Sequence, residues 1–176
     1  MPTTRASAFE QTVRSCVPRE RTKDMPRPSS GHLALQKMEG TWEGQETMHP
    51  SQWDPKGGVA IGRNRHTLGL GGFALIIDYE QERDGKVTFT GHGVYTYDPS
   101  KNQYCLHWFD CLGSPPEVFV GGFDGDVMTL THGGPGMHAR MTYDLSIPNT
   151  LRGQMEMSPD GEEWKVLFEA VYKRTG

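Results

Sequence analysis

The chain has 176 residues, a net charge of −4 and 23% charged residues, which fits one soluble globular domain. The charge is uneven, because residues 1–30 hold six basic and three acidic side chains and the remainder holds 12 and 19. An acidic body argues against nucleic acid as the main partner. No apolar run approaches 18 residues, so we expect no membrane span.

The chain has three cysteines, Cys16, Cys105 and Cys111, whose number and spacing indicate the redox state of its cellular compartment. They form no CxxC pair, and their odd number fits a reducing compartment better than a disulfide framework. The N-terminus has no apolar segment of the secretory type. We therefore expect a cytoplasmic protein. A weak organelle-targeting peptide is the alternative, which the acidic residues of the N-terminal segment disfavour.

The first 30 residues are rich in Arg, Pro, Ser and Thr and show no hydrophobic period. This composition predicts a disordered tail over 1–30 and a single domain over 31–176. Residues 31–38 are short and apolar at Leu33, Leu35 and Met38. We expect a helical turn there that plugs one end of the domain.

From Glu39 onward, segments of alternating polarity are separated by glycine- and proline-containing turns. No segment has room for a crossover helix, so neighbouring strands are antiparallel. Such a sheet removes its edges by closing. We predict an all-β fold, a closed up-and-down antiparallel barrel of about ten strands, over 40–48, 58–69, 72–82, 86–97, 103–111, 117–123, 126–132, 137–145, 150–157 and 163–173.

The turns between strands predict which face points inward. A three-residue loop, Arg83–Gly85, would pair Tyr79 with Phe89, and the next link would pair Gly93 with Trp108. A two-residue turn would shift the register by one and exchange the faces. The preferred register also pairs Leu68 with Phe73, directs Asn64, His66, Tyr95 and Tyr104 inward and His92 and His107 to solvent, and sets Met155 and Met157 against Val166 and Trp164 on the inner face.

A mostly apolar interior with a few polar groups is typical of a small-molecule site. An acid and an imidazole there, Asp110 and His66, would suit general acid–base catalysis. The alternative is a structural role for both residues, in which Asp110 is solvated at the barrel mouth and His66 has a hydrogen-bond partner inside the core. We expect ligand contacts from Asn64, His66, Tyr79, Tyr95, Trp108, Asp110, Trp53 and His49.

The segment from Met48 to Gly58 is long for a hairpin link and carries Trp53 between two prolines. A stiff loop with an aromatic tip would fold over the barrel mouth as a lid. The alternative is a decorated hairpin whose Trp53 covers the barrel end.

Histidines flank a glycine-rich link, from His132 to His138. No third ligand is spaced to join them, so we expect no metal site. No P-loop, dinucleotide fingerprint or GxSxG motif is present, and we expect no cofactor.

Several short motifs together resemble the family catalogued as domain of unknown function 1579. They are Gly40-Thr41-Trp42-Glu43-Gly44, typical of calycin-like barrels, His49-Pro50 with Trp53 and Gly57-Gly58, Asp78-Tyr79-Glu80-Gln81, Gly91-His92-Gly93, His107-Trp108-Phe109-Asp110, and Met155-Glu156-Met157-Ser158-Pro159-Asp160-Gly161. The resemblance covers roughly residues 33–173. It implies a lipocalin-like barrel and no particular activity.

Nitrobindin-like haem barrels share the Gly-Thr-Trp opening and hold haem through a histidine near the end of the last strand. The corresponding segment here, Trp164 to Lys173, contains no histidine. Haem would need another ligand, such as His66 or His132.

These observations favour a binding module for a small, mostly apolar ligand. A cofactor-free cyclase, isomerase or dehydratase using the same interior is the alternative, and haem or metal binding is the third. Whether the chain is an enzyme stays open, as does a homodimer.

Overall fold

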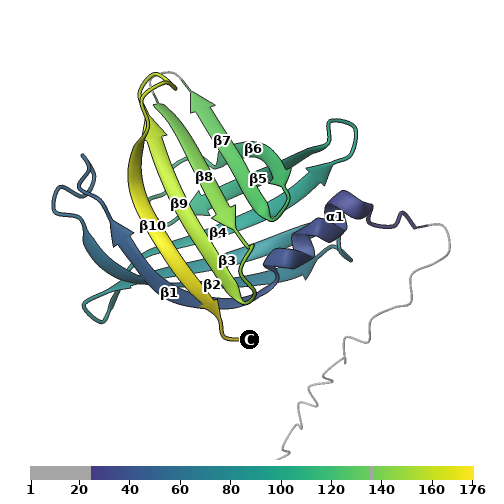
Figure 1. Cartoon of the computed structure of the whole chain (residues 1–176), viewed down its shortest axis with the longest axis horizontal. Helices are drawn as coiled ribbons and strands as arrows, with labels where there is room; N and C mark the ends of the chain where they lie inside the picture. The colour runs from purple at the N-terminus through teal and green to yellow at the C-terminus, as the bar shows by residue number, and fades with distance from the viewer. Residues whose placement is uncertain (1–24, 135–136) are drawn as a thin grey trace, which may run out of the picture.

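The computed structural model describes residues 25–134 and 137–176, which form one closed barrel (Figure 1). Each strand pairs antiparallel with the next along the chain, and the first pairs with the last. The prediction of a closed ten-stranded antiparallel barrel is confirmed. The elements are α1 (Ser30–Ala34), η1 (Leu35–Met38), β1 (Gly40–Met48), β2 (Gly58–Gly69), β3 (Ala74–Arg83), β4 (Lys86–Asp98), β5 (Gln103–Asp110), β6 (Glu117–Asp124), β7 (Val127–Gly134), β8 (Met137–Asp144), β9 (Thr150–Ser158) and β10 (Lys165–Arg174).

The predicted helical turn is present as α1 and the 3₁₀ turn η1, which close one end of the barrel. Leu35 and Met38 of η1 are fully buried in the core. The hydroxyl of Tyr104 on β5 donates a hydrogen bond of 2.9 Å to the carbonyl of Gly31 and ties α1 to the sheet. Most of the predicted tail, residues 1–24, lies outside the described residues.

The core at this closed end consists of large side chains that are almost completely buried. Trp42 of β1 donates its indole N–H to the carbonyl of Met38 at 3.0 Å, and the guanidinium of Arg174 lies 4.2 Å from the centre of its ring. The Gly-Thr-Trp opening therefore joins the plug to the last strand. The other fully buried core residues at this end include Leu75, Tyr95, Leu106, Met128 and Leu130.

The β3–β4 hairpin differs from the expected three-residue loop. Its turn has two residues, Asp84 and Gly85, with positive φ of 51° and 73°, the conformation that matches the twist of two strands. A β-bulge follows, between the pairs Glu82↔Val87 and Gln81↔Phe89. The shorter turn and the bulge each shift the register by one residue.

The two shifts add to two residues, and a displacement of two keeps every side chain on the same face of the sheet. The inward and outward faces of this hairpin are therefore as predicted, although the cross-strand partners differ. Tyr79 pairs with Gly91 instead of Phe89. The β2–β3 register is also displaced by two residues, since Leu68 pairs with Leu75 instead of Phe73. The predicted pairing of Gly93 with Trp108 is confirmed.

The β9–β10 hairpin corrects a second expectation. Met155 pairs with Phe168, whereas Val166 pairs with Glu156, and the ladder is interrupted between them. This bulge directs Phe168 inward and places Val166 on the outer face, contrary to the prediction. Trp164 also lies outside, where its ring packs against the guanidinium of Arg140 at 4.2 Å.

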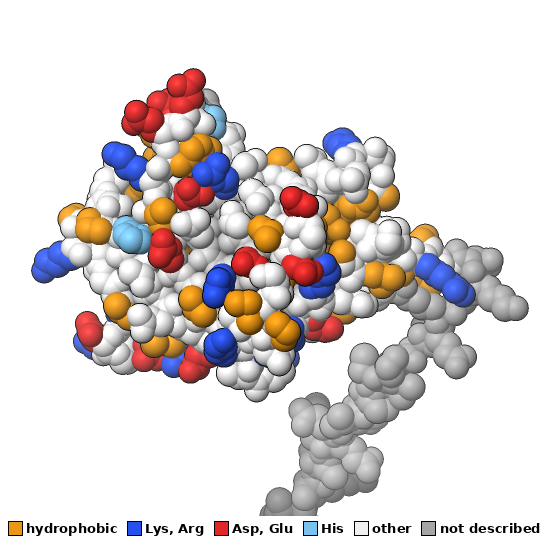
Figure 2. All heavy atoms as spheres, viewed as in Figure 1, with side chains coloured by type: hydrophobic (Ala, Val, Ile, Leu, Met, Phe, Trp, Pro, Cys, Tyr) orange, Lys and Arg blue, Asp and Glu red, His pale blue; other side chains and the backbone are white. Residues whose placement is uncertain are grey.

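The outer surface carries interspersed charges of both signs on the face shown in Figure 2. Arg63 of β2 is held between Glu43 at 2.8 Å and Glu82 at 2.9 Å on the two adjacent strands. Such exposed cross-strand pairs contribute little to stability individually. No helix within the described part of the chain is long and apolar enough to cross a membrane.

Candidate functional site

The end of the barrel opposite α1 differs from the closed end, because several of its inward-facing apolar side chains are only partly buried. Side chains of a strand alternate between faces, so the residues that share a face with the buried Glu46, Leu106 and Ala139 point into the barrel. The partly exposed inward residues at this open end include Met48, Phe89, Trp108, Met157 and Phe168. Solvent therefore reaches the apolar inner wall at the open end.

Trp108 forms one side of this wall and lies flat over two glycines of β4. A Cβ atom at Gly91 would lie 2.2 Å from the Trp108 ring, and one at Gly93 would lie 3.2 Å from it. The absence of side chains at Gly91 and Gly93 thus leaves the space that the Trp108 ring fills. The ring of Tyr79 lies 6.1 Å from Trp108 and 6.0 Å from Phe89, which makes a continuous aromatic surface.

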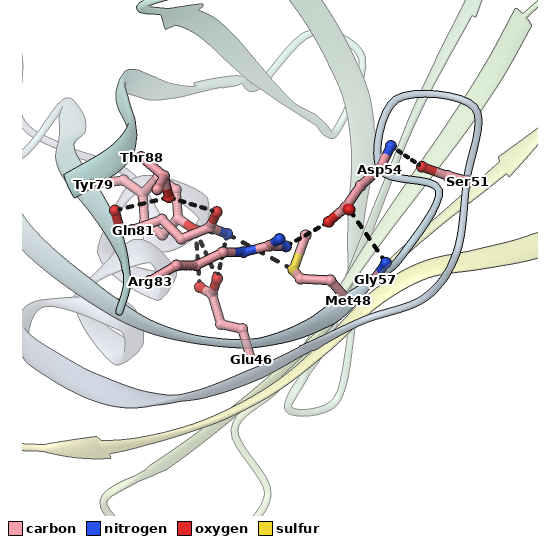
Figure 3. Close-up of polar contacts among 9 residues, drawn as sticks. All are labelled: Glu46, Met48, Ser51, Asp54, Gly57, Tyr79, Gln81, Arg83 and Thr88. Carbon is pink, nitrogen blue, oxygen red and sulfur yellow. Dashed lines mark hydrogen bonds and ion pairs between the residues drawn. The ribbon is translucent and has the colours of Figure 1, made fainter. Parts of the chain in front are cut away.

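Glu46 of β1 lies below this surface and has no exposed area. Its carboxylate accepts hydrogen bonds from the hydroxyl of Tyr79 at 2.9 Å and from the side-chain amide of Gln81 at 2.7 Å (Figure 3). The hydroxyl of Tyr172 donates a third hydrogen bond, of 2.5 Å. The Gln81 amide also lies 3.7 Å from the sulfur of Met48. Three donors from two distant parts of the barrel converge on one buried acid, which fulfils the requirement that buried polar groups be paired.

The tyrosines around Glu46 stay protonated at neutral pH. Burial, followed by the charge of Glu46, raises the pKa of both Tyr79 and Tyr172 well above 10. Burial likewise raises the pKa of Tyr143 to about 12. The cluster thus presents neutral hydroxyl donors to the carboxylate.

Tyr95 adds a polar atom that is not satisfied. Its side chain is fully buried, and burial together with the neighbouring Tyr143 raises its pKa. The two hydroxyls are close enough to influence each other's ionisation, but the Tyr95 hydroxyl has no well-aligned hydrogen bond among the described residues. An unsatisfied buried hydroxyl is costly, so the Tyr95 hydroxyl destabilises the core relative to a hydrogen-bonded one.

The loop between β1 and β2 is tied to the open end through an ion pair. Nη2 of Arg83, at the end of β3, lies 2.6 Å from the carboxylate of Asp54 (Figure 3), and this hydrogen bond lowers the pKa of Asp54. The same carboxylate accepts the N–H of Gly57, and the Ser51 hydroxyl accepts the N–H of Asp54. These contacts fix the shape of the loop.

Residues 27–174 match the family described as "Protein of unknown function (DUF1579)". The chain belongs to this family. The search of curated proteins finds no match. Among solved structures, this DUF1579 protein is similar to Rv2717c from M. tuberculosis, with 16% identity, a TM-score of 0.62 and coverage of 85% of this chain and 100% of the other.

A second similar structure is the S-type phycobiliprotein lyase CPES from Guillardia theta. It has 9% identity, a TM-score of 0.51 and coverage of 85% of this chain and 99% of the lyase. At these identities the likeness shows that the DUF1579 chain shares a barrel fold with both proteins, and its role is argued from its own site.

The two residues expected to act as acid and base lie apart in the DUF1579 barrel. His66 is buried at the closed end, where its Nδ1 bonds the carbonyl of Met38 at 2.8 Å, and burial lowers its pKa to about 4. Asp110 ends β5 at the open end and accepts the N–H of Leu112 at 2.9 Å. The His66–Asp110 pair is therefore not assembled, and each side chain has a structural partner.

The other predicted ligand contacts of the DUF1579 protein divide between the two ends. Tyr79 and Trp108 face the open end, while Tyr95 is enclosed below it. Asn64 is partly exposed and pairs across β2 with Trp42 and Tyr79. These placements make Tyr79 and Trp108 the predicted residues with the best access to a molecule in the mouth.

The loop predicted to act as a lid carries Trp53, whose side chain is 59% exposed. His49 is partly buried at the base of the loop. The loop is held by Asp54 and Arg83 rather than by the tryptophan.

Sequence reasoning missed the carboxylate at the centre of the barrel and its partners Gln81, Tyr143 and Tyr172. A signal was present, since Glu46 follows Trp42 by four residues along β1 and so shares its inward face. A carboxylate is rarely buried unless it is paired, and its partners come from β3 and β10, which no local pattern connects to β1.

The histidines considered for metal or haem have other partners in the DUF1579 barrel. His132 bonds the carbonyl of Val118 and packs on Phe119. His92, which was expected to face solvent, lies on the outer face and bonds Asp78. His66 lies within the packed closed end, so a haem bound there would have to displace core side chains. Among the described residues, no three His, Cys, Asp or Glu side chains are grouped to hold a metal ion.

Proposed function

We propose that the protein binds a small, largely apolar molecule in the open end of the barrel. The observation that carries this proposal is the partial exposure of an apolar inner wall, which includes Met48, Trp108 and Phe168. Apolar surface left in water is unfavourable by about 25 cal/mol per Å². A ligand that covers this wall recovers that free energy.

The polar cluster supports the same function. Glu46 and its donors form a satisfied network beneath the wall, and satisfied buried networks rigidify their surroundings. A preformed wall binds a ligand without first ordering its own side chains. The similarity to a phycobiliprotein lyase, a barrel named for its action on a pigment protein, agrees with a small-molecule role.

The experiment compares neighbouring aromatic residues on opposite faces of β5. Trp108 faces the interior, whereas Phe109 is 45% exposed on the outer face. N-phenyl-1-naphthylamine, a neutral fluorophore that brightens in apolar surroundings, serves as the probe. Trp108→Ala should weaken probe binding by about 1–3 kcal/mol, and Phe109→Ala should leave it unchanged.

Met157→Lys provides a second inner-wall variant at a partly exposed position. It should also weaken probe binding, because the ammonium group would sit on the apolar wall. Probe binding that is lost in Phe109→Ala and retained in both inner-wall variants would show that the site lies on the outer face and would overturn the proposal.

A further inference from the structure

Two buried nitrogen atoms near the open end have no hydrogen-bond partner among the described residues. They are Nε of Arg83 and Nε2 of His49. The Arg83 guanidinium uses Nη2 for Asp54, so its Nε–H is a donor left without an acceptor. Buried donors are nearly always paired in folded proteins, so the unpartnered Nε–H of Arg83 at a candidate binding site points to an acceptor atom of a ligand.

The position of Arg83 connects these nitrogens to the apolar wall. Arg83 follows Gln81 by two residues on β3 and so shares its inward face. Figure 3 shows its side chain extending toward the loop past Met48 and Gln81. Met48 immediately precedes His49 and lies 3.7 Å from the Gln81 amide. Met48 therefore lies where the polar side chains of Gln81 and Arg83 meet the apolar inner wall.

We propose that the ligand is amphipathic and carries a carboxylate, which accepts the Nε–H of Arg83 while its apolar part lies along the inner wall. The inference rests on the proposed function and names the class of ligand. Arginine is well suited to carboxylates, because its planar guanidinium donates in fixed directions. The Nε–H is the donor of Arg83 that Asp54 leaves free, since the ion pair uses Nη2.

The experiment measures displacement of N-phenyl-1-naphthylamine by octanoate and by octan-1-ol, which share an apolar chain and differ in the head group. The wild-type protein should bind octanoate more tightly than octan-1-ol. Arg83→Gln should weaken octanoate binding about tenfold, the scale of one hydrogen bond to a charged group, and should leave octan-1-ol binding unchanged.

Two variants serve as matched controls. Asp54→Asn removes the same ion pair but leaves the guanidinium free, so octanoate should bind more tightly than to the wild type. Arg63→Gln removes an arginine whose ion pairs lie on the outer face, and it should change neither affinity. Opposite effects of Arg83→Gln and Asp54→Asn separate recognition of the carboxylate from loss of the loop contact.

The outcomes distinguish this inference from the proposed function. If both octyl compounds displace the probe equally well and Arg83→Gln alters neither, the carboxylate inference is overturned and the binding function stands. If Arg83→Gln and Asp54→Asn weaken octanoate alike, the ion pair acts only by holding the loop, and the inference is again overturned. Failure of the wild-type protein to bind the probe or either octyl compound would overturn both.

Discussion

Removal of the Glu46 side chain tests whether the buried cluster organises the barrel. Glu46→Ala leaves three buried donors without their acceptor, on Tyr79, Gln81 and Tyr172. Each unsatisfied donor costs roughly 1–3 kcal/mol. Partial relief comes from rotation of the hydroxyls and entry of water, so the free energy of unfolding should fall by about 4 kcal/mol.

The control is Glu43, which lies three residues earlier on the outer face of the same strand. Its carboxylate pairs with Arg63 in an exposed ion pair, so Glu43→Ala should change the free energy of unfolding by no more than about 0.5 kcal/mol. Glu46→Gln keeps the shape of the side chain but replaces one acceptor with a donor, and an intermediate loss of about 2 kcal/mol is expected.

Urea denaturation at pH 7 measures the free energy of unfolding of all three variants. If the dependence of that free energy on urea concentration is the same in each, differences in the midpoint report differences in stability alone. A thermal melt should show a lower midpoint for Glu46→Ala by roughly 10 °C. Equal and small effects of Glu46→Ala and Glu43→Ala would refute the reasoning, because they would mean that the carboxylate is not buried among the tyrosines.

Three further predictions concern the closed end and the aromatic wall. Burial lowers the pKa of His66 in the folded protein to about 4, so as the pH falls the unfolded chain binds a proton at this histidine before the folded protein does. The free energy of unfolding should therefore fall by about 3 kcal/mol as the pH drops from about 6.5 to about 4. His66→Gln should flatten this pH dependence in urea titrations, and an unchanged dependence would contradict the burial of His66. Trp42→Ala should cost about 3–5 kcal/mol in urea denaturation through the cavity it leaves, and a loss under about 0.5 kcal/mol would contradict barrel closure. Gly91→Ala should push Trp108 from its place, cost about 1–3 kcal/mol and shift the tryptophan emission, and an emission spectrum equal to that of the wild type would contradict the packing.

The barrel and nearly all of its strand boundaries could be predicted from the alternation of polar and apolar residues, because that period depends only on strand geometry. Register could be predicted only in part. The Asp84–Gly85 turn is short, and the bulge beside Gln81 compensates for it. The inward and outward faces were therefore predicted correctly, although the predicted register differs from the observed one by two residues.

The β9–β10 hairpin had no such compensation. A single bulge between Val166 and Phe168 exchanged the inward residue, and no residue in this segment identifies the bulge in advance. The candidate site was harder still. Tyr79 and Trp108 were found from their local pattern, whereas Glu46 becomes informative only when β3 and β10 bring its donors to it.

Methionine methyl NMR tests the central claim most directly, because methionines lie at both ends of the barrel. With ¹³C-methyl methionine and saturating N-phenyl-1-naphthylamine, the aromatic probe should shift the methyl signals of Met48 and Met157 at the open end. Met38 and Met128, which are fully buried at the closed end, should keep their shifts. Binding that moves Met38 and Met128 while leaving Met48 and Met157 unchanged would contradict a ligand site in the open end.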